Sequence, residues 1–106
     1  MTQITDRFVE VVVDAPTDRP GDLFTYSLPH DIQVRPGQMV LVPFGKRQLR
    51  AVVVRGMKTP NVDYTRDVLD LLSSDPLVSP VQLSLALWVS WYYRCRLFEA
   101  ITPMLP

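Results

Sequence analysis

The sequence predicts a mainly β domain with C-terminal α-helix: a small OB-like, partly open five-stranded barrel packed against two helices. Up to residue 72, short runs of β-branched and aromatic residues alternate with turns that contain proline and glycine. Beyond residue 78, a helix-capping signature precedes a longer apolar segment. The 106 residues, 47% of them apolar and 21% charged, fit one domain with its own core.

Four strands are predicted before residue 55. Residues 8–13 are mostly valine and contain no strand breaker. A loop at 14–21, which holds two prolines and a glycine, separates them from a second run at 23–28. Residues 39–42 and 49–54 form the third and fourth strands on either side of a short basic turn. These four runs supply most of the predicted barrel.

A turn and a fifth strand complete the β part of the prediction. Residues 35–38 fit a type II turn, because Pro36 fixes the first central φ and Gly37 supplies the positive one. Residues 66–72 could form either a strand or a short helix. We favour a strand, since the third and fourth strands carry apolar residues on both faces and need a partner.

Two helices are predicted to follow. Ser79 is a favourable N-cap, Pro80 occupies the first helical position and Gln82 completes a capping box. The helix at 80–94 is apolar on nearly all faces, so we expect it to be largely buried. A second short helix, at 97–102, is expected to end before the proline at position 103.

Aromatic residues could serve either the core or a nucleic acid. Phe24 and Tyr26 alternate on one predicted strand and therefore share a face, while Phe44 lies at the basic turn. Each of these rings could pack in the core or stack on a base. A second group of aromatic residues lies in the predicted helix at 80–94, among several leucines. These leucines favour a core position for all four rings: Trp88, Trp91, Tyr92 and Tyr93.

The charge distribution points to a short contact with phosphate. Net charge is zero, but residues 35–66 carry seven Lys or Arg residues against one aspartate, between two acidic ends. Such a patch suits a few nucleotides rather than a long duplex. Phe44, Gly45, Lys46 and Arg47 bring a ring, a side-chain-free position and two cations to one turn. The alternative is an ordinary hairpin with a solubilising turn.

The sequence offers no catalytic constellation, so we expect neither an enzyme nor a bound cofactor or metal in this chain. His30 is the only histidine, and the single Cys95 excludes an intrachain disulfide and a cysteine zinc site. Gly45-Lys46 is followed by Arg47 and lacks the upstream glycine of a P-loop. No secretory signal or membrane-spanning segment is visible, and a cytoplasmic location is expected.

Several motifs together resemble one family. They are Asp18-Arg19-Pro20 with Phe24-Thr25-Tyr26, Val42-Pro43-Phe44-Gly45-Lys46, Ser74-Asp75-Pro76 and Trp91-Tyr92-Tyr93. In this order they resemble the N-terminal domain of the bacterial replication-restart helicase PriA (primosomal protein N′). The resemblance covers residues 1–106, which we expect to be a single 3′-DNA-binding domain excised from a longer helicase.

The resemblance implies a domain that binds the 3′ terminus of the nascent leading strand at stalled or abandoned replication forks. Binding there would orient the helicase for primosome assembly and replication restart. The family's pocket corresponds to Phe24, Thr25, Gly45 and Arg66. Two positions depart from the family: aspartate is frequent where this chain has Thr25, and lysine is usual where it has Arg66.

These residues suggest a mechanism for holding a 3′ end. Phe24 would stack on the terminal base or sugar, and the backbone at Gly45 would approach the ribose closely. Thr25 would hydrogen-bond the terminal hydroxyl. Arg66 would hold the adjacent phosphate with its forked guanidinium, supported by Lys46 and Arg47.

Partners and alternatives follow from the same resemblance. DNA 3′ ends and forked DNA, the helicase core of the same parent chain, and other primosome or single-strand-binding proteins are the expected partners, with no membrane. The parent would be an ATP-dependent 3′–5′ DNA helicase, with ATP and zinc bound outside these residues. The alternatives are a protein-interaction barrel that docks an acidic partner and an RNA-binding barrel.

Overall fold

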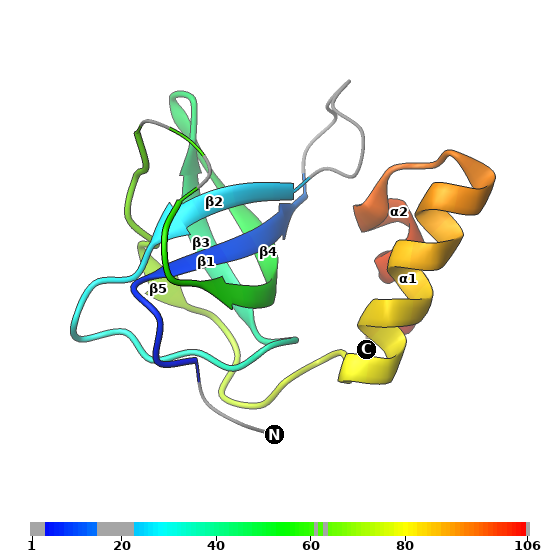
Figure 1. Cartoon of the computed structure of the whole chain (residues 1–106), viewed down its shortest axis with the longest axis horizontal. Coiled ribbons are helices and arrows are strands. Elements are labelled where there is room, and N and C mark those ends of the chain that lie inside the picture. The colour runs from blue at the N-terminus through cyan, green and yellow to red at the C-terminus, as the bar shows by residue number, and fades with distance from the viewer. Residues whose placement is uncertain (1–3, 15–22, 61, 63, 106) are drawn as a thin grey trace.

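The computed structural model describes residues 4–14, 23–60, 62 and 64–105. Its five strands form one sheet in the order β2-β1-β4-β3-β5, and all neighbours are antiparallel. Two α-helices lie beside the sheet (Figure 1). This arrangement confirms the predicted small, open OB-like barrel with C-terminal helices. The element bounds are β1 (Phe8–Val13), β2 (Leu23–Ser27), β3 (Met39–Phe44), β4 (Arg47–Met57), β5 (Asp70–Leu71), α1 (Pro80–Tyr93), α2 (Leu97–Ile101) and the 3-10 helix η2 (Thr102–Met104).

The predicted fifth strand is much shorter than residues 66–72. Only Asp70–Leu71 pair with β3 as a strand, and an isolated parallel bridge joins Ser27 to Asp67. The segment changes partner along its length: Ser27 N–H donates to the Arg66 carbonyl, whereas Leu69 N–H donates to the Leu41 carbonyl. It therefore spans the gap between β2 and β3 and cannot pair with one of them throughout. This bridging position fixes Arg66 beside β2.

The sheet carries a core on each face. Alternation along the strands sends successive side chains to opposite sides. The inner core of the curved sheet contains Val9, Val11, Tyr26, Val40, Val42 and Val53. The outer core packs the helices on the opposite face and contains Val12, Val52, Leu83, Ala86, Leu97 and Ile101.

The N-terminus of α1 is built as predicted. Ser79 accepts a hydrogen bond from the Gln82 backbone, and the Gln82 side chain accepts one from the Ser79 N–H. These reciprocal bonds form the expected capping box. The α1 helix ends at Tyr93 and is followed by its C-cap, Arg94, which has a positive φ of 54°. At the second helix, α2 ends before Pro103 and η2 continues the chain.

The expected burial of α1 is wrong. Only Leu83, Ala86 and Ser90 of this helix are buried, and the four aromatic residues expected in the core are exposed: Trp88, Trp91, Tyr92 and Tyr93. One side of α1 faces α2 and the sheet, and no described element covers the opposite side (Figure 1). An apolar composition all round the helix therefore does not bring burial all round in this chain.

A glycine holds the loop before α1 against the sheet. Gly37 has a φ of +91°, and Gln38 N–H donates to the Arg35 carbonyl, as expected for the type II turn. A Cβ at Gly37 would lie 1.9 Å from the carbonyl oxygen of Val78. Glycine is thus required here for both its conformation and its lack of a side chain.

Candidate nucleic-acid interface

The β3–β4 hairpin forms one wall of the candidate site. Its two-residue turn consists of Gly45 and Lys46, and Gly45 has a φ of +62°. Glycine at the first central position with positive φ is typical of a type II′ turn, which matches the twist of the flanking strands. A Cβ added at Gly45 would meet no atom within 4 Å. The space in front of this backbone is therefore open.

Two phenylalanine rings lie beside the hairpin. Phe24 of β2 and Phe44 of β3 pack edge to face, with ring centroids 5.2 Å apart and planes at 87°. Both rings are partly buried against the inner core. Phe44 therefore helps to fix the orientation of the Phe24 ring. The two uses considered for Phe24, packing and stacking, are compatible in this arrangement.

Arg66 joins the hairpin to β2. Its Nη1 donates a 2.9 Å hydrogen bond to the Gly45 carbonyl, across 21 positions of sequence. Its own carbonyl accepts from Ser27 N–H at 2.9 Å. A guanidinium has five donors, so this bond leaves others for a ligand. The structure thus brings together Phe24, Gly45 and Arg66, which the sequence resemblance placed in one pocket.

Beneath these residues, Tyr26 ties β2 to β3. Its hydroxyl donates a 2.7 Å hydrogen bond to the Pro43 carbonyl, and the side chain is buried. Burial raises the pKa of the Tyr26 hydroxyl, and the positive charge of Arg66 partly opposes this increase. Tyr26 therefore supports the floor of the site as a neutral, hydrogen-bonded group. Of the two roles considered for the Tyr26 ring, the structure therefore shows the core position.

Thr25 stands differently from the other three residues. Phe24 pairs with Val11 and Thr25 with Glu10, so the two side chains project to opposite faces of the sheet. The Thr25 hydroxyl lies 3.9 Å from the Met57 sulfur. The backbone N–H of Ser27 points away from β1 and donates to the Arg66 carbonyl. In an antiparallel strand, residues two positions apart direct their backbone groups to the same side, so the Thr25 backbone faces this same edge of β2. The Thr25 main chain therefore faces the edge of β2 at which Arg66 lies, while its side chain does not.

The cations near the site differ in their pairing. Within the described part of the chain, Arg50 and Arg55 form salt bridges with Asp14 and Glu10. Lys46, Arg47 and Arg66 form none there and are exposed. Their charges are therefore not neutralised by a described neighbouring carboxylate. We call the arrangement of Phe24, Phe44, Gly45 and Arg66, flanked by Lys46 and Arg47, the hairpin notch.

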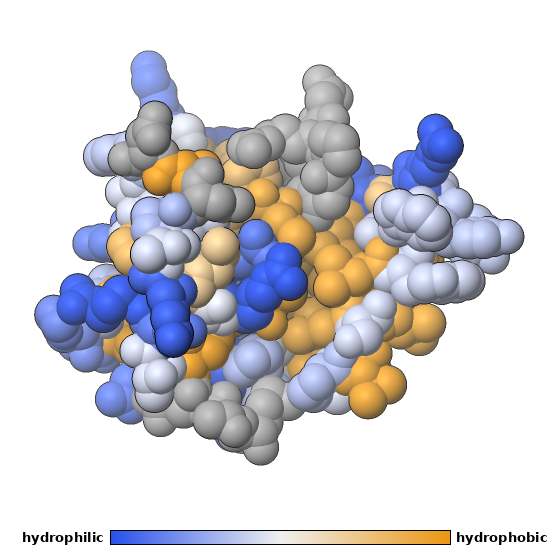
Figure 2. All heavy atoms as spheres, in the orientation of Figure 1, coloured by the Kyte–Doolittle hydropathy of each residue, from blue (hydrophilic) through white to orange (hydrophobic). Residues whose placement is uncertain are grey.

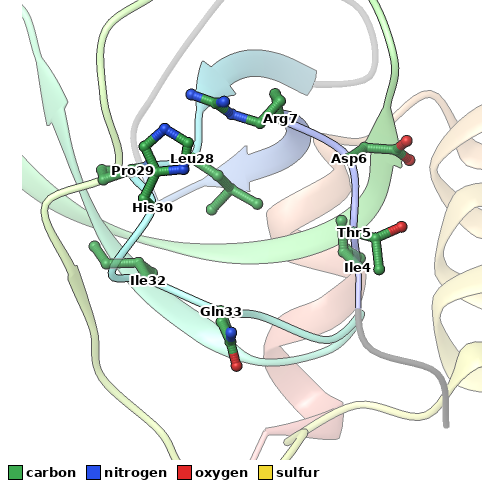
Figure 3. A pocket seen from close by; sticks show the side chains of 9 residues that line it. All are labelled: Ile4, Thr5, Asp6, Arg7, Leu28, Pro29, His30, Ile32 and Gln33. Carbon is green, nitrogen blue, oxygen red and sulfur yellow. The ribbon is translucent and has the colours of Figure 1, made fainter.

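No sequence pattern indicates the two hydrogen bonds that assemble the notch. One bond joins Tyr26 to Pro43, and the other joins Arg66 to Gly45. Both depend on how β2 and the segment at 66–72 fold across the sheet, so no local sequence motif predicts them. A separate shallow pocket of about 250 Å³ lies near the N-terminal segment (Figure 3). It contains His30 and Arg7 but no residue of the hairpin notch.

Comparison with known proteins decides the family. Residues 10–106 match the sequence model described as the 3′-DNA-binding domain (3′BD) of PriA. The chain belongs to the PriA 3′-DNA-binding domain family. The Asp18-Arg19-Pro20 part of the resemblance lies outside the described residues.

Three curated relatives agree with this assignment. The replication restart protein PriA of Haemophilus influenzae is 30% identical over 102 residues, which cover 94% of this chain and 14% of that protein. PriA of Treponema pallidum is 26% identical over 93% of this chain, and PriA of Synechocystis is 31% identical over 91%. The chain spans only 12–16% of the length of these relatives.

The described part of the chain (residues 4–14, 23–60, 62 and 64–105) has neither a membrane-spanning helix nor a cluster suited to a metal ion. No helix there has the length and apolar character needed to cross a bilayer. The same residues contain no group of three His, Cys, Asp or Glu side chains placed to hold a metal ion.

Proposed function

We propose that the hairpin notch binds the 3′ terminus of a DNA strand. The observation that carries this proposal is the hydrogen bond from Arg66 to the Gly45 carbonyl, because it places a cation beside an open backbone position and an aromatic ring. These are the three components that a terminal nucleotide needs: a donor for phosphate, room for the sugar and a face for the base.

Each residue has a separate role in the proposal. Phe24 stacks on the terminal base or sugar, which is tolerant of sequence because every base has a flat face. Gly45 admits the ribose, and Arg66 binds the adjacent phosphate with Lys46 and Arg47 in support. The Thr25 carbonyl replaces the expected hydroxyl as the acceptor for the terminal 3′-OH. A carbonyl oxygen has two lone pairs, so it can accept this bond in addition to another.

The wider role is proposed from family membership. In a longer PriA polypeptide, capture of the nascent leading-strand 3′ end would orient a DNA helicase at a stalled or abandoned fork for primosome assembly. Catalysis, ATP and zinc would belong to that remainder and not to the hairpin notch. The name shared by the relatives, replication restart protein, supports this proposal.

Single substitutions test the notch. Fluorescence anisotropy with a labelled single strand is expected to show weaker binding for Phe24→Ala and Arg66→Ala. Phe24→Ala also loses its packing on Phe44 and the inner core, so binding is measured at a temperature at which circular dichroism shows each variant to be folded. Arg96→Ala is the matched control, since it removes one cation on the helical side whose partner is the exposed Glu99. Equal weakening by Arg96→Ala would contradict the proposal.

Binding of a DNA strand and of an RNA strand with the same sequence is compared to distinguish the proposal from the alternative of an RNA-binding barrel. We expect the DNA strand to bind at least as tightly as the RNA strand, because no group in the notch requires a 2′-hydroxyl. A strong preference for RNA would favour the alternative reading.

A further inference from the structure

The outward side of α1 is apolar from end to end. Val81, Leu85, Trp88 and Tyr92 recur at intervals of four and three residues and therefore form one stripe along the helix. This stripe lies opposite the buried residues Leu83, Ala86 and Ser90. We call these four residues the α1 outer stripe, and each of them is at least half exposed.

The stripe has the composition of a protein interface. The Trp88 and Tyr92 rings stack with centroids 5.0 Å apart, and Trp91 is 78% exposed beside them. Aromatic side chains cover about 150–250 Å² each, so the exposed rings alone give an apolar area that monomeric proteins rarely leave to water. Tryptophan and tyrosine are also the residues that most often dominate binding energy at interfaces.

The lack of charge on α1 argues against a nucleic acid as the partner of the α1 outer stripe. The 14 residues of α1 contain no Asp, Glu, Lys, Arg or His. Figure 2 shows the surface around the helices as orange to pale, with strongly hydrophilic side chains only toward its upper end. Phosphate binding draws its affinity from cations, which α1 lacks. A partner surface that is itself apolar and uncharged fits this stripe.

The relatives indicate where such a partner surface would come from. The region matching this chain makes up 14% of the Haemophilus influenzae protein, so there the domain is accompanied by a far larger remainder. In this chain, Met104 and Leu105 pack against the same apolar cluster as α1. A polypeptide that continued from them would begin beside α1, at a high effective concentration. The turn of the β3–β4 hairpin lies at the end of the sheet that points away from the helices (Figure 1).

We propose that the α1 outer stripe docks this domain onto the remainder of a PriA polypeptide, against an uncharged apolar surface of that remainder. Docking through α1 leaves the hairpin notch open. The proposal rests on the family membership of the chain and is independent of what the notch binds. DNA affinity of the isolated chain therefore tests the notch, and protection of the stripe tests the docking.

Hydroxyl-radical footprinting by mass spectrometry tests the docking directly, because tryptophan and tyrosine are oxidised in proportion to their exposure. The 106-residue chain is compared with the complete PriA polypeptide that carries it. Tyr64, which is 79% exposed and outside α1, serves as the internal reference. We expect the oxidation of Trp88, Trp91 and Tyr92, relative to Tyr64, to fall several-fold in the complete polypeptide.

A pair of variants assigns that protection to the stripe. Leu85→Glu places a carboxylate in the stripe and should restore the oxidation of Trp88 in the complete polypeptide. Leu69→Glu is the matched control, because Leu69 is 43% exposed and Leu85 50%, and it should leave the protection intact. Both variants should stay folded and unfold cooperatively with similar losses of stability, since the two leucines are exposed to a similar extent.

Three outcomes would overturn the docking proposal. The first is equal oxidation of the stripe in the isolated chain and the complete polypeptide. The second is protection of the isolated chain that grows with its own concentration, which would identify a second copy as the occupant. The third is protection of the isolated chain by single-stranded DNA, which would make α1 a stacking surface.

Discussion

At the scale of single residues, the hairpin notch depends on groups that hold one another in place. Tyr26 fixes the hairpin strand through the Pro43 carbonyl, and Arg66 fixes the turn through the Gly45 carbonyl. Phe44 orients Phe24 by edge-to-face contact. Binding sites work best when such contacts set the geometry before the ligand arrives.

Tyr26→Phe should lower stability at neutral pH and change its alkaline dependence. The lost bond to Pro43 costs about 1 kcal/mol. The folded-state pKa of Tyr26 lies above its ordinary value of 10.0, so the folded protein keeps a proton that the unfolded chain releases. Stability from this group is complete below pH 10 and is lost as pH rises through the folded-state pKa.

Urea unfolding between pH 8 and the highest pH at which the protein stays folded checks this prediction. The unfolding free energy of the wild type should decline more steeply above about pH 10 than that of Tyr26→Phe. Tyr64→Phe, at an exposed tyrosine, is the control for stability and should match the wild-type unfolding free energy at pH 8. Parallel curves for the wild type and Tyr26→Phe would contradict the assignment.

Arg66→Ala should weaken DNA binding with little effect on folding. A charge-assisted hydrogen bond is worth about 1.5–3 kcal/mol, which corresponds to a loss of about ten- to hundredfold in affinity. Anisotropy titration of a single strand with a free 3′ end measures this loss. An affinity within twofold of wild type, about 0.4 kcal/mol, would remove Arg66 from the site.

At the scale of elements, two glycines with positive φ have different purposes. Gly37 lies where the chain before α1 approaches the sheet, and a Cβ there would strike the Val78 carbonyl. Gly45 faces open space at the hairpin. The first serves the fold, and the second leaves room in the notch.

Alanine at each glycine should separate these purposes. Gly45→Ala should cost about 1–3 kcal/mol of stability from backbone strain alone. Gly37→Ala should cost more, because the strain is joined by a backbone collision at 1.9 Å. Thermal unfolding measures both losses. A larger loss at Gly45 than at Gly37 would contradict this interpretation.

The elements also show what could be predicted from sequence. Valine-rich runs and the capping box mark β1 and the start of α1 within one residue, because both signals are local. The sequence favours a full strand over a short helix at 66–72, but the structure pairs the segment first with β2 and then with β3, which depends on tertiary geometry. Likewise, the composition of α1 shows that it is apolar but not which side is covered.

The candidate site was predictable only as a set of residues. Family resemblance grouped Phe24, Gly45 and Arg66, and the structure brings them together. It could not show that Thr25 projects from the opposite face, which follows from the register of β2 with β1.

At the scale of the whole molecule, a net charge of zero limits how the domain can attract DNA. Its cations are concentrated at the hairpin, where Lys46, Arg47 and Arg66 have no described carboxylate partner. On the proposed function, attraction of DNA is therefore expected to be local to the notch. Long-range steering by a large net charge is not available to this chain.

The salt dependence of binding should reflect this small number of contacts. About three phosphate contacts to a single strand give a slope of about −2 in a plot of log affinity against log salt concentration. Titrations between 50 and 200 mM salt, a range in which about tenfold changes are easily measured, check this value. A slope steeper than about −5 would require a much longer track of phosphates.

The most direct test of the central claim compares two strands that differ only at the 3′ terminus. One ends in a free hydroxyl and the other in a 3′-phosphate, and both carry the same label at the 5′ end. We predict that the phosphate weakens binding clearly, because it removes the terminal hydroxyl bond and crowds the space before Gly45. Equal affinity for the two strands would contradict recognition of the end.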